Sequence, residues 1–179
     1  MTDQIRVPRS LRPHCRGTFL LAAIASVAIF AVGQEAVVDH ADRVVVHKKE
    51  RTLELFKNGL SFRKYKIALG AQPAGPKTQE GDHKTPEGVY VIDRRNEHSK
   101  FYRALHISYP NADDQSRAER LGVSPEGDIM IHGLPNGFGW LGASHRMKDW
   151  TDGCIAVTDK EMDEIWQLVP DGTSIEIAP

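Results

Sequence analysis

Cysteine is scarce in this sequence, which has two cysteines among its 179 residues. Cys15 lies among arginines near the N-terminus, so Cys154 is the single cysteine of the chain that follows. A framework of disulfide bonds within the domain is therefore excluded. A lone cysteine in an exported protein indicates an intermolecular bridge or a reactive thiol, and an inert buried cysteine is the third interpretation.

An excess of positive charge is also lacking. The 23 lysines and arginines are balanced by 24 aspartates and glutamates, which gives a net charge of −1 at pH 7. This balance gives no indication of nucleic acid as a partner. The sequence lacks a phosphate-binding loop, a dinucleotide fingerprint and any cluster with metal-ligand spacing, so we expect neither a metal nor another cofactor.

Long apolar runs are limited to one uncharged stretch, from Thr18 to Gly33, and positive residues precede it. This order is typical of a secretory signal, and the small residues Ala31 and Gly33 fit cleavage before Gln34. An uncleaved anchor and a buried helix are the alternatives, although the run is slightly short for the ~20 residues that span a bilayer. We therefore expect residues 1–33 to be a signal peptide or an N-terminal anchor, and the protein to be exported. The positive residues are Arg6, Arg9, Arg12 and Arg16.

Short β-rich segments dominate the rest of the chain. Asn58-Gly59 is the strongest two-residue hairpin signal and joins the strand candidates 51–57 and 60–70. Residues 71–88 are rich in proline and glycine and predict a long loop, a type that is often functional. Further strands are expected at 43–48, 89–95, 104–109, 128–133 and 173–178.

Helical patterns are fewer than strand patterns. Residues 112–122 and 158–168 are the two candidates, and Thr158 and Glu161 stand in capping-box register at the start of the second. Many strands with one or two helices in a chain of this length predict one mainly β, sandwich-like domain over residues 42–179.

Cys154 stands in a setting that fits a catalytic thiol. Such a thiol needs a base, donors for an oxyanion and an exposed position. Gly153 gives a backbone point at which an amide can face a substrate carbonyl, and the Cys154 amide is the natural second donor. Two histidines are candidates for the base: His132, which ends an apolar strand before a glycine, and His145, which is close in sequence. The residue pattern leaves both open, and also a structural role for each.

Three ordered motifs carry a family resemblance. They are "GDHKTPEGVYVI" at 81–92, "IHG" at 131–133 and "WTDGCIAVT" at 150–158. Together they resemble the L,D-transpeptidase catalytic domain (YkuD type), most closely the branch with a W-T-x-G-C signature. The resemblance covers roughly Arg43 to Ile177, and it is the combination of motifs at suitable spacing that makes it specific.

The resemblance implies specific roles. Cys154 would be the nucleophile and His132 the general base, with the Gly133 carbonyl fixing the histidine tautomer. The amides of Gly153 and Cys154 would form the oxyanion hole. The family fold is a β-sandwich, in which the cysteine and the histidine meet at the end of a groove.

The implied substrate is a peptidoglycan stem peptide, attacked at its L,D amide bond in the periplasm or cell envelope. In a transpeptidase, the acyl group of the Cys thioester would be transferred to an amine. In a hydrolase it would be transferred to water, and the enzyme would be either an L,D-carboxypeptidase or an amidase that releases protein linked to peptidoglycan. A non-catalytic wall-binding module and an envelope protein with an intermolecular disulfide are the other hypotheses. We expect a monomer, which would contact a membrane only through an uncleaved N-terminal segment.

Two departures from the family pattern concern the surroundings of the thiol. Asp152 occupies the position, two before the cysteine, where the commonest pattern has histidine, and no arginine follows in "CIAVT". A carboxylate beside the thiol disfavours the thiolate. Aromatic residues between His132 and Cys154 either form the floor of a substrate groove or hold a glycine-rich loop in place by packing. The candidates for substrate binding are Asp152, Thr151, Trp150, Trp140 and Tyr109.

Overall fold

Eight strands make up the sheet of the computed structural model, which describes residue 2 and residues 39–179. They are β1 (Arg43–His47), β2 (Thr52–Lys57), β3 (Leu60–Lys66), β4 (Gly88–Ser99), β5 (Tyr102–Ile107), β6 (Met130–His132), β7 (Ile155–Ala156) and β8 (Ser174–Ala178). Their order is β3-β2-β1-β8-β4-β5-β6-β7. The expected mainly β class is confirmed. The signal peptide or anchor expected at 1–33 lies outside the described residues.

Local turn chemistry sets up the first half of the sheet. Asn58 and Gly59 both have positive φ, +51° and +79°, and connect β2 to β3 in an antiparallel pair as the sequence predicts. β1 pairs antiparallel with β2 on one side and parallel with β8 on the other. The C-terminal strand therefore lies in the middle of the sheet, where it also pairs with β4.

The two ends of the strand order are joined by the segment that leaves β3. Ala68 exchanges two backbone hydrogen bonds with Ala156 of β7, with N–O distances of 2.9 and 2.8 Å. Two residues on, Gly70 forms a further bridge with Thr151. The sheet is thus curled, so that the segment after β3 pairs with β7 at the other end of the strand order. This pairing brings the 71–88 loop next to the residues that precede β7.

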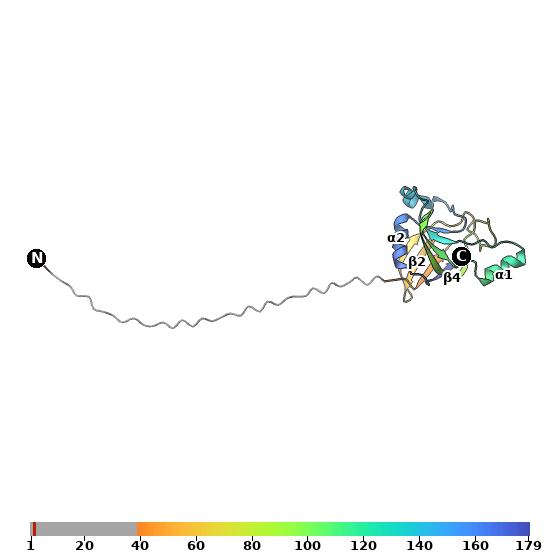
Figure 1. Ribbon diagram of the computed structural model, residues 1–179, viewed down its shortest axis with the longest axis horizontal. Coiled ribbons are helices and arrows are strands. Elements are labelled where there is room, and N and C mark those ends of the chain that lie inside the picture. Colours follow the sequence, from red (N-terminus) through yellow and green to blue (C-terminus); the bar gives the residue numbers. More distant parts are fainter. Residues whose placement is uncertain (1, 3–38) are drawn as a thin grey trace. The chain divides into compact units, whose positions relative to one another are not determined.

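Within residues 39–179, three short helices accompany the sheet: α1 (Ala112–Leu121), the 3-10 helix η1 (Gly139–Met147) and α2 (Asp159–Leu168). α1 and α2 confirm the two predicted helices, and each begins with a complete capping box. Figure 1 shows these two helices on opposite sides of the strands. η1 was not expected, because its sequence is interrupted by Gly142, which has non-helical φ and ψ. None of the helices in residues 39–179 is long and apolar enough to cross a membrane.

One continuous core holds these elements together. α2 buries Met162 and Ile165 completely, and it packs against β5 and β6. Each such side chain contributes about 1.5–3 kcal/mol on burial. Because β6 ends in His132, this packing also fixes the strand that carries the candidate base.

The hairpin of β4 and β5 is longer than the sequence indicates. Strands were expected at 89–95 and 104–109, whereas β4 continues to Ser99 and β5 begins at Tyr102. Register shifts between Ile92 and Arg94 and between Asn96 and Ser99 show where the alternation of side chains is broken. These irregularities hid the extension, which carries the hairpin tip to the candidate site.

Candidate active site

Cys154 follows a tight turn that is held by the side chain of Thr151. The Thr151 hydroxyl donates to the Cys154 carbonyl at 2.7 Å and accepts a hydrogen bond from the Gly153 amide at 3.2 Å. Gly153 has a φ of +136°, and a Cβ atom there would lie 2.6 Å from the carbonyl oxygen of Lys84. The turn therefore requires glycine before the cysteine, both for its backbone conformation and for its close approach to the 71–88 loop.

His132 is presented at the end of β6 in a single tautomer. Its Nδ1 lies 2.6 Å from the Gly133 carbonyl oxygen, which can only accept a hydrogen bond. The proton is thus on Nδ1, and Nε2 carries the free lone pair. The side chain is 4% exposed, and burial lowers the pKa of His132, opposed in part by the hydrogen bond to Gly133. A neutral imidazole with a free Nε2 can act as a proton acceptor.

The thiol of Cys154 is half-buried and protonated at rest. Burial raises its pKa to about 11, and the carboxylates of Glu126 and Asp152 also raise it. A backbone hydrogen bond with Met130 and the charge of Lys77 act in the opposite direction. The effect of Asp152 has the sign that the sequence predicts.

The candidate nucleophile and base share one cavity of about 530 Å³. The Cys154 thiol donates a hydrogen bond to the Asp128 carbonyl oxygen, with a distance of 3.6 Å between sulfur and oxygen. Within residues 39–179, no hydrogen bond joins this sulfur to a histidine. The ring of Phe101 lies 4.7 Å from the ring of His132, between centroids, and covers it. The cavity is lined by Asn96, His98, Ser99, Lys100, Phe101, Asp128, Met130, His132, Trp150, Thr151, Asp152 and Cys154.

Only one of the two amides expected to form the oxyanion hole is free of an internal hydrogen bond. Because the Gly153 amide donates to Thr151 Oγ1, it is engaged within the turn, which corrects the expectation that it faces a substrate. The Cys154 amide has no partner among the hydrogen bonds of the described chain. It is therefore the donor of this turn that remains for a developing negative charge.

Asp152 lies at the mouth of the cavity and is paired with the 71–88 loop. Its side chain is 81% exposed, and its Oδ1 lies 2.8 Å from Nδ1 of His83. His83 lies in the loop that the sequence predicts at 71–88, and only the fold reveals its proximity to the turn of Cys154. The carboxylate at this position thus has a histidine partner, although that histidine comes from a distant segment.

The other residues proposed for substrate binding divide into two groups. Thr151 and Trp150 line the cavity with Asp152, as expected for residues that contact substrate. Trp140 is 78% exposed and is absent from the cavity lining. Tyr109 is 3% exposed, and its hydroxyl donates to the Pro125 carbonyl at 2.8 Å. The expectation for Tyr109 was wrong, because its ring is part of the core.

His145 faces a different cavity from His132. Its Nδ1 lies 3.4 Å from the indole Nε1 of Trp150, which donates to it. Burial, and next the charge of Arg146, lower the pKa of His145 to about 4. The lining of the Cys154 cavity includes His132 and excludes His145, so the geometry favours His132 where the residue pattern alone left both open.

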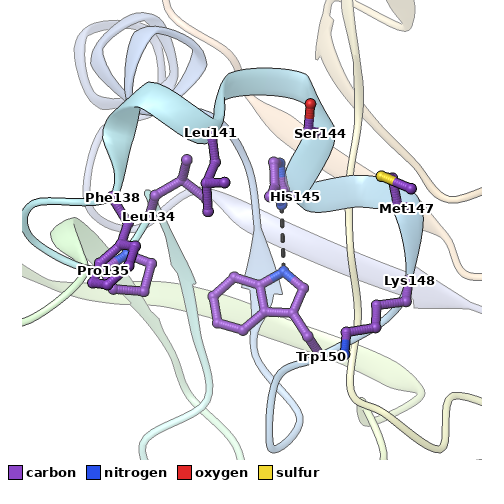
Figure 2. A pocket seen from close by; sticks show the side chains of 9 residues that line it. All are labelled: Leu134, Pro135, Phe138, Leu141, Ser144, His145, Met147, Lys148 and Trp150. Atoms are coloured by element: carbon purple, nitrogen blue, oxygen red, sulfur yellow. Dashed lines mark hydrogen bonds between the residues drawn. The ribbon is translucent and has the colours of Figure 1, made fainter.

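This second cavity is apolar and has a volume of about 550 Å³. Figure 2 shows His145 and Trp150 pointing toward each other across it. Trp150 lines both cavities and forms the wall between them. η1 thus supplies a second concave surface beside the thiol site, and its residues are Leu134, Pro135, Phe138, Leu141, Ser144, His145, Met147, Lys148 and Trp150.

Sequence reasoning missed the β4–β5 contribution to the thiol cavity. Asn96 and residues 98–101 line it although they are far from Cys154 in the chain. The run of polar residues with His98 and Phe101 was the only available signal, and it is equally typical of an exposed turn. Lys77 and Glu126, which influence the thiol, were also missed.

Comparison with known proteins identifies the family of the chain. Residues 41–177 match the family model of the YkuD L,D-transpeptidase catalytic domain. The Escherichia coli (strain K12) protein named "Putative L,D-transpeptidase YafK" is 34% identical over 134 residues, which cover 70% of this chain and 46% of YafK.

Solved structures show the same fold. The helical cell shape determining protein Pgp2 from Campylobacter jejuni aligns with a TM-score of 0.61 and 27% identity, over 78% of this chain and 48% of Pgp2. An L,D-transpeptidase from Mycobacterium smegmatis aligns with a TM-score of 0.51 and 14% identity, over 78% of this chain and 59% of that chain, and supports the fold alone. The chain spans about half the length of YafK and of Pgp2. With most of its described residues covered by the family match, this chain belongs to the YkuD L,D-transpeptidase catalytic domain family.

Proposed function

We propose that the protein is a cysteine-dependent acyltransferase that acts on peptidoglycan stem peptides, an L,D-transpeptidase of the cell envelope. The observation that carries this proposal is the shared cavity of Cys154 and His132, in which Nε2 of His132 is a free proton acceptor. Family membership supports the reaction class. The names "Putative L,D-transpeptidase YafK" and "helical cell shape determining protein Pgp2" support a wall substrate.

The first half of the reaction forms a thioester. His132 Nε2 takes the proton of the Cys154 thiol while the sulfur attacks the carbonyl carbon of an L,D amide bond. The Cys154 amide stabilises the oxyanion of the tetrahedral intermediate. As the carbon–nitrogen bond breaks, the imidazolium returns its proton to the leaving amine, which departs as the first product.

The second half regenerates the enzyme. An acceptor amine attacks the thioester, loses a proton to His132 and becomes the new amide, while the sulfur leaves and is reprotonated. The raised pKa of Cys154 and the lowered pKa of His132 make a resting thiolate–imidazolium pair unfavourable. Proton transfer therefore accompanies substrate attack, and the hydrogen bond from sulfur to Nε2 forms when substrate displaces the contact with Asp128.

Hydrolysis of the thioester is the second candidate reaction, and Asp152 favours it. This exposed carboxylate lines the cavity and is held by His83, so it can accept a hydrogen bond from an attacking water. The same charge would also attract the ammonium form of an amine acceptor. The balance between water and amine is therefore proposed to depend on Asp152.

Export to the envelope is part of the proposal. It rests on the charged and apolar pattern of residues 1–33 and on the peptidoglycan substrate. A wall-binding module without activity and a protein that is cross-linked through Cys154 remain as alternative outcomes.

The test is incubation of the purified protein with muropeptides, followed by mass spectrometry of the products. Cross-linked dimers would identify a transpeptidase, and shortened stems would identify a hydrolase. Cys154→Ser and His132→Gln should remove either product while retaining the fold. A folded, reduced wild-type protein that gives neither product, and is not acylated at Cys154 by a carbapenem, would refute the proposed function.

A further inference from the structure

Lys77 is a completely buried lysine in the 71–88 loop, and it has no part in the proposed proton transfers. Its side chain is 0% exposed, which for an ammonium group requires compensating partners. Nζ lies 2.9 Å from Asp82 Oδ1 and 2.6 Å from Glu126 Oε2. A third contact, of 3.5 Å, is with the Asp152 carbonyl oxygen.

These contacts join three separate segments of the chain. Asp82 belongs to the same loop as Lys77, Glu126 lies in the stretch before β6, and Asp152 belongs to the turn of the nucleophile. A side chain built on Gly153 would have its Cβ 3.5 Å from Nζ. The ammonium therefore lies directly behind the peptide that leads into Cys154.

The cluster carries more negative than positive charge. Burial raises the pKa of Asp82, but backbone hydrogen bonds and the contact with Lys77 lower it to about 2, so this carboxylate is ionised at neutral pH. The charges of Glu126 and Asp152 oppose ionisation of Cys154, and the smaller effect of the Lys77 charge favours it. Removal of Lys77 would leave the developing thiolate facing carboxylates alone.

We propose that Lys77 is a positioning residue for the nucleophile: its ammonium, paired with Asp82 and Glu126, holds the Asp152–Gly153 turn and places a positive charge behind Cys154. This inference deepens the proposed function, because a more accessible thiolate is useful only if Cys154 reacts. Its test, however, needs no turnover of peptidoglycan.

A matched control is available in the same region. Lys48 is also buried and paired, with Nζ 2.8 Å from Glu87 and 2.8 Å from the Thr85 carbonyl. It lines a separate cavity that does not include Cys154. Lys48→Met thus removes a buried lysine of similar structural importance without changing the charge behind the thiol.

The experiment measures alkylation of Cys154 by iodoacetamide in the full chain at several pH values, with site-resolved mass spectrometry to separate Cys154 from Cys15. Below the midpoint of the thiol, the rate follows the thiolate fraction. A rise of half a pKa unit makes it about threefold slower. Lys77→Met should slow alkylation by up to about threefold, whereas Lys77→Arg and Lys48→Met should both react at close to the wild-type rate.

Two further variants separate charge from a general loss of order. Glu126→Gln should accelerate alkylation about threefold, because it removes a carboxylate that opposes the thiolate. Lys77→Met combined with Glu126→Gln should recover most of the lost rate. Such recovery would not follow if Lys77 only held the fold, since the double variant has lost both partners.

The inference is overturned if folded Lys77→Met reacts at the wild-type rate, or if Lys48→Met slows alkylation equally. If Lys77→Met does not fold, an unchanged rate in Glu126→Gln overturns it. The proposed function fails separately, when the wild type yields no muropeptide product although alkylation still depends on Lys77.

Discussion

Replacement of Gly153 by alanine tests the geometry of the turn that presents the nucleophile. At a φ of +136°, a residue with a side chain carries a backbone strain of about 1–3 kcal/mol. The added Cβ would also lie 2.6 Å from the Lys84 carbonyl oxygen and 3.0 Å from Ile129 Cδ1. Overpacking of this kind adds about 1–3 kcal/mol, so we expect a total loss of about 4 kcal/mol.

Two other glycines separate strain from steric overlap. Gly137 has a φ of +87° but no atom within 4 Å of a built Cβ, so Gly137→Ala should show the strain alone, about 2 kcal/mol. Gly127 has neither a positive φ nor a neighbour, and Gly127→Ala should change stability by less than about 0.5 kcal/mol.

Thermal and urea unfolding of the three variants, compared with wild type, provides the measurement. For a domain of this size about 4 kcal/mol corresponds to a decrease in Tm of roughly 15 °C. Alkylation of Cys154 should change in Gly153→Ala and stay constant in the other two. A Gly153→Ala variant no less stable than Gly137→Ala would refute the close approach of the turn to the 71–88 loop.

The remaining predictions concern the groups around the two cavities. The pKa of His145 is about 4 in the folded protein, below its ordinary value of 6.5. Between these pH values the unfolded chain binds more protons than the folded one, so the free energy of unfolding should fall as the pH decreases from 6.5 to 4. Urea unfolding should show a loss of at most about 3 kcal/mol in wild type and a flatter profile in His145→Gln, and identical profiles would contradict the burial of this ring. Asp152→Asn should accelerate alkylation of Cys154 about threefold and raise the ratio of cross-linked to hydrolysed muropeptides, whereas the exposed control Asp113→Asn should alter neither. Trp150→Ala, at the wall between the cavities, should slow acylation of Cys154 by a carbapenem about ten-fold or more, while Trp140→Ala should change the rate less than twofold; equal effects would count against the assigned cavity.

Features encoded by neighbouring residues were predictable from the sequence. Asn58-Gly59 gives its hairpin through positive φ at two adjacent positions, and Thr158 with Glu161 starts α2 through reciprocal capping. His132 was one of two candidates for the base because it ends an apolar strand before a glycine, and the family resemblance favoured it over His145. In each case the physical cause lies within a few residues along the chain.

Features that depend on long-range contacts were not predictable. Lys77 resembled any lysine of a polar loop until the fold placed Glu126 and the Asp152 carbonyl around it. Tyr109 was among the candidates for substrate binding, yet its ring lies in the core. The Gly153 amide was expected to be free, and only the Thr151 hydroxyl explains why it is not.

The bridge between Ala68 and Ala156 has a consequence for when the thiol becomes a nucleophile. The strand after Cys154 is paired on one side with β6 and on the other with a segment from the first half of the chain. Ala68 and Ala156 are distant in sequence, and pairing them requires the closure of a long loop. We therefore expect Cys154 and His132 to share their cavity only after this pairing has formed. The meeting of nucleophile and base is in this sense a property of the whole fold rather than of the turn around the thiol.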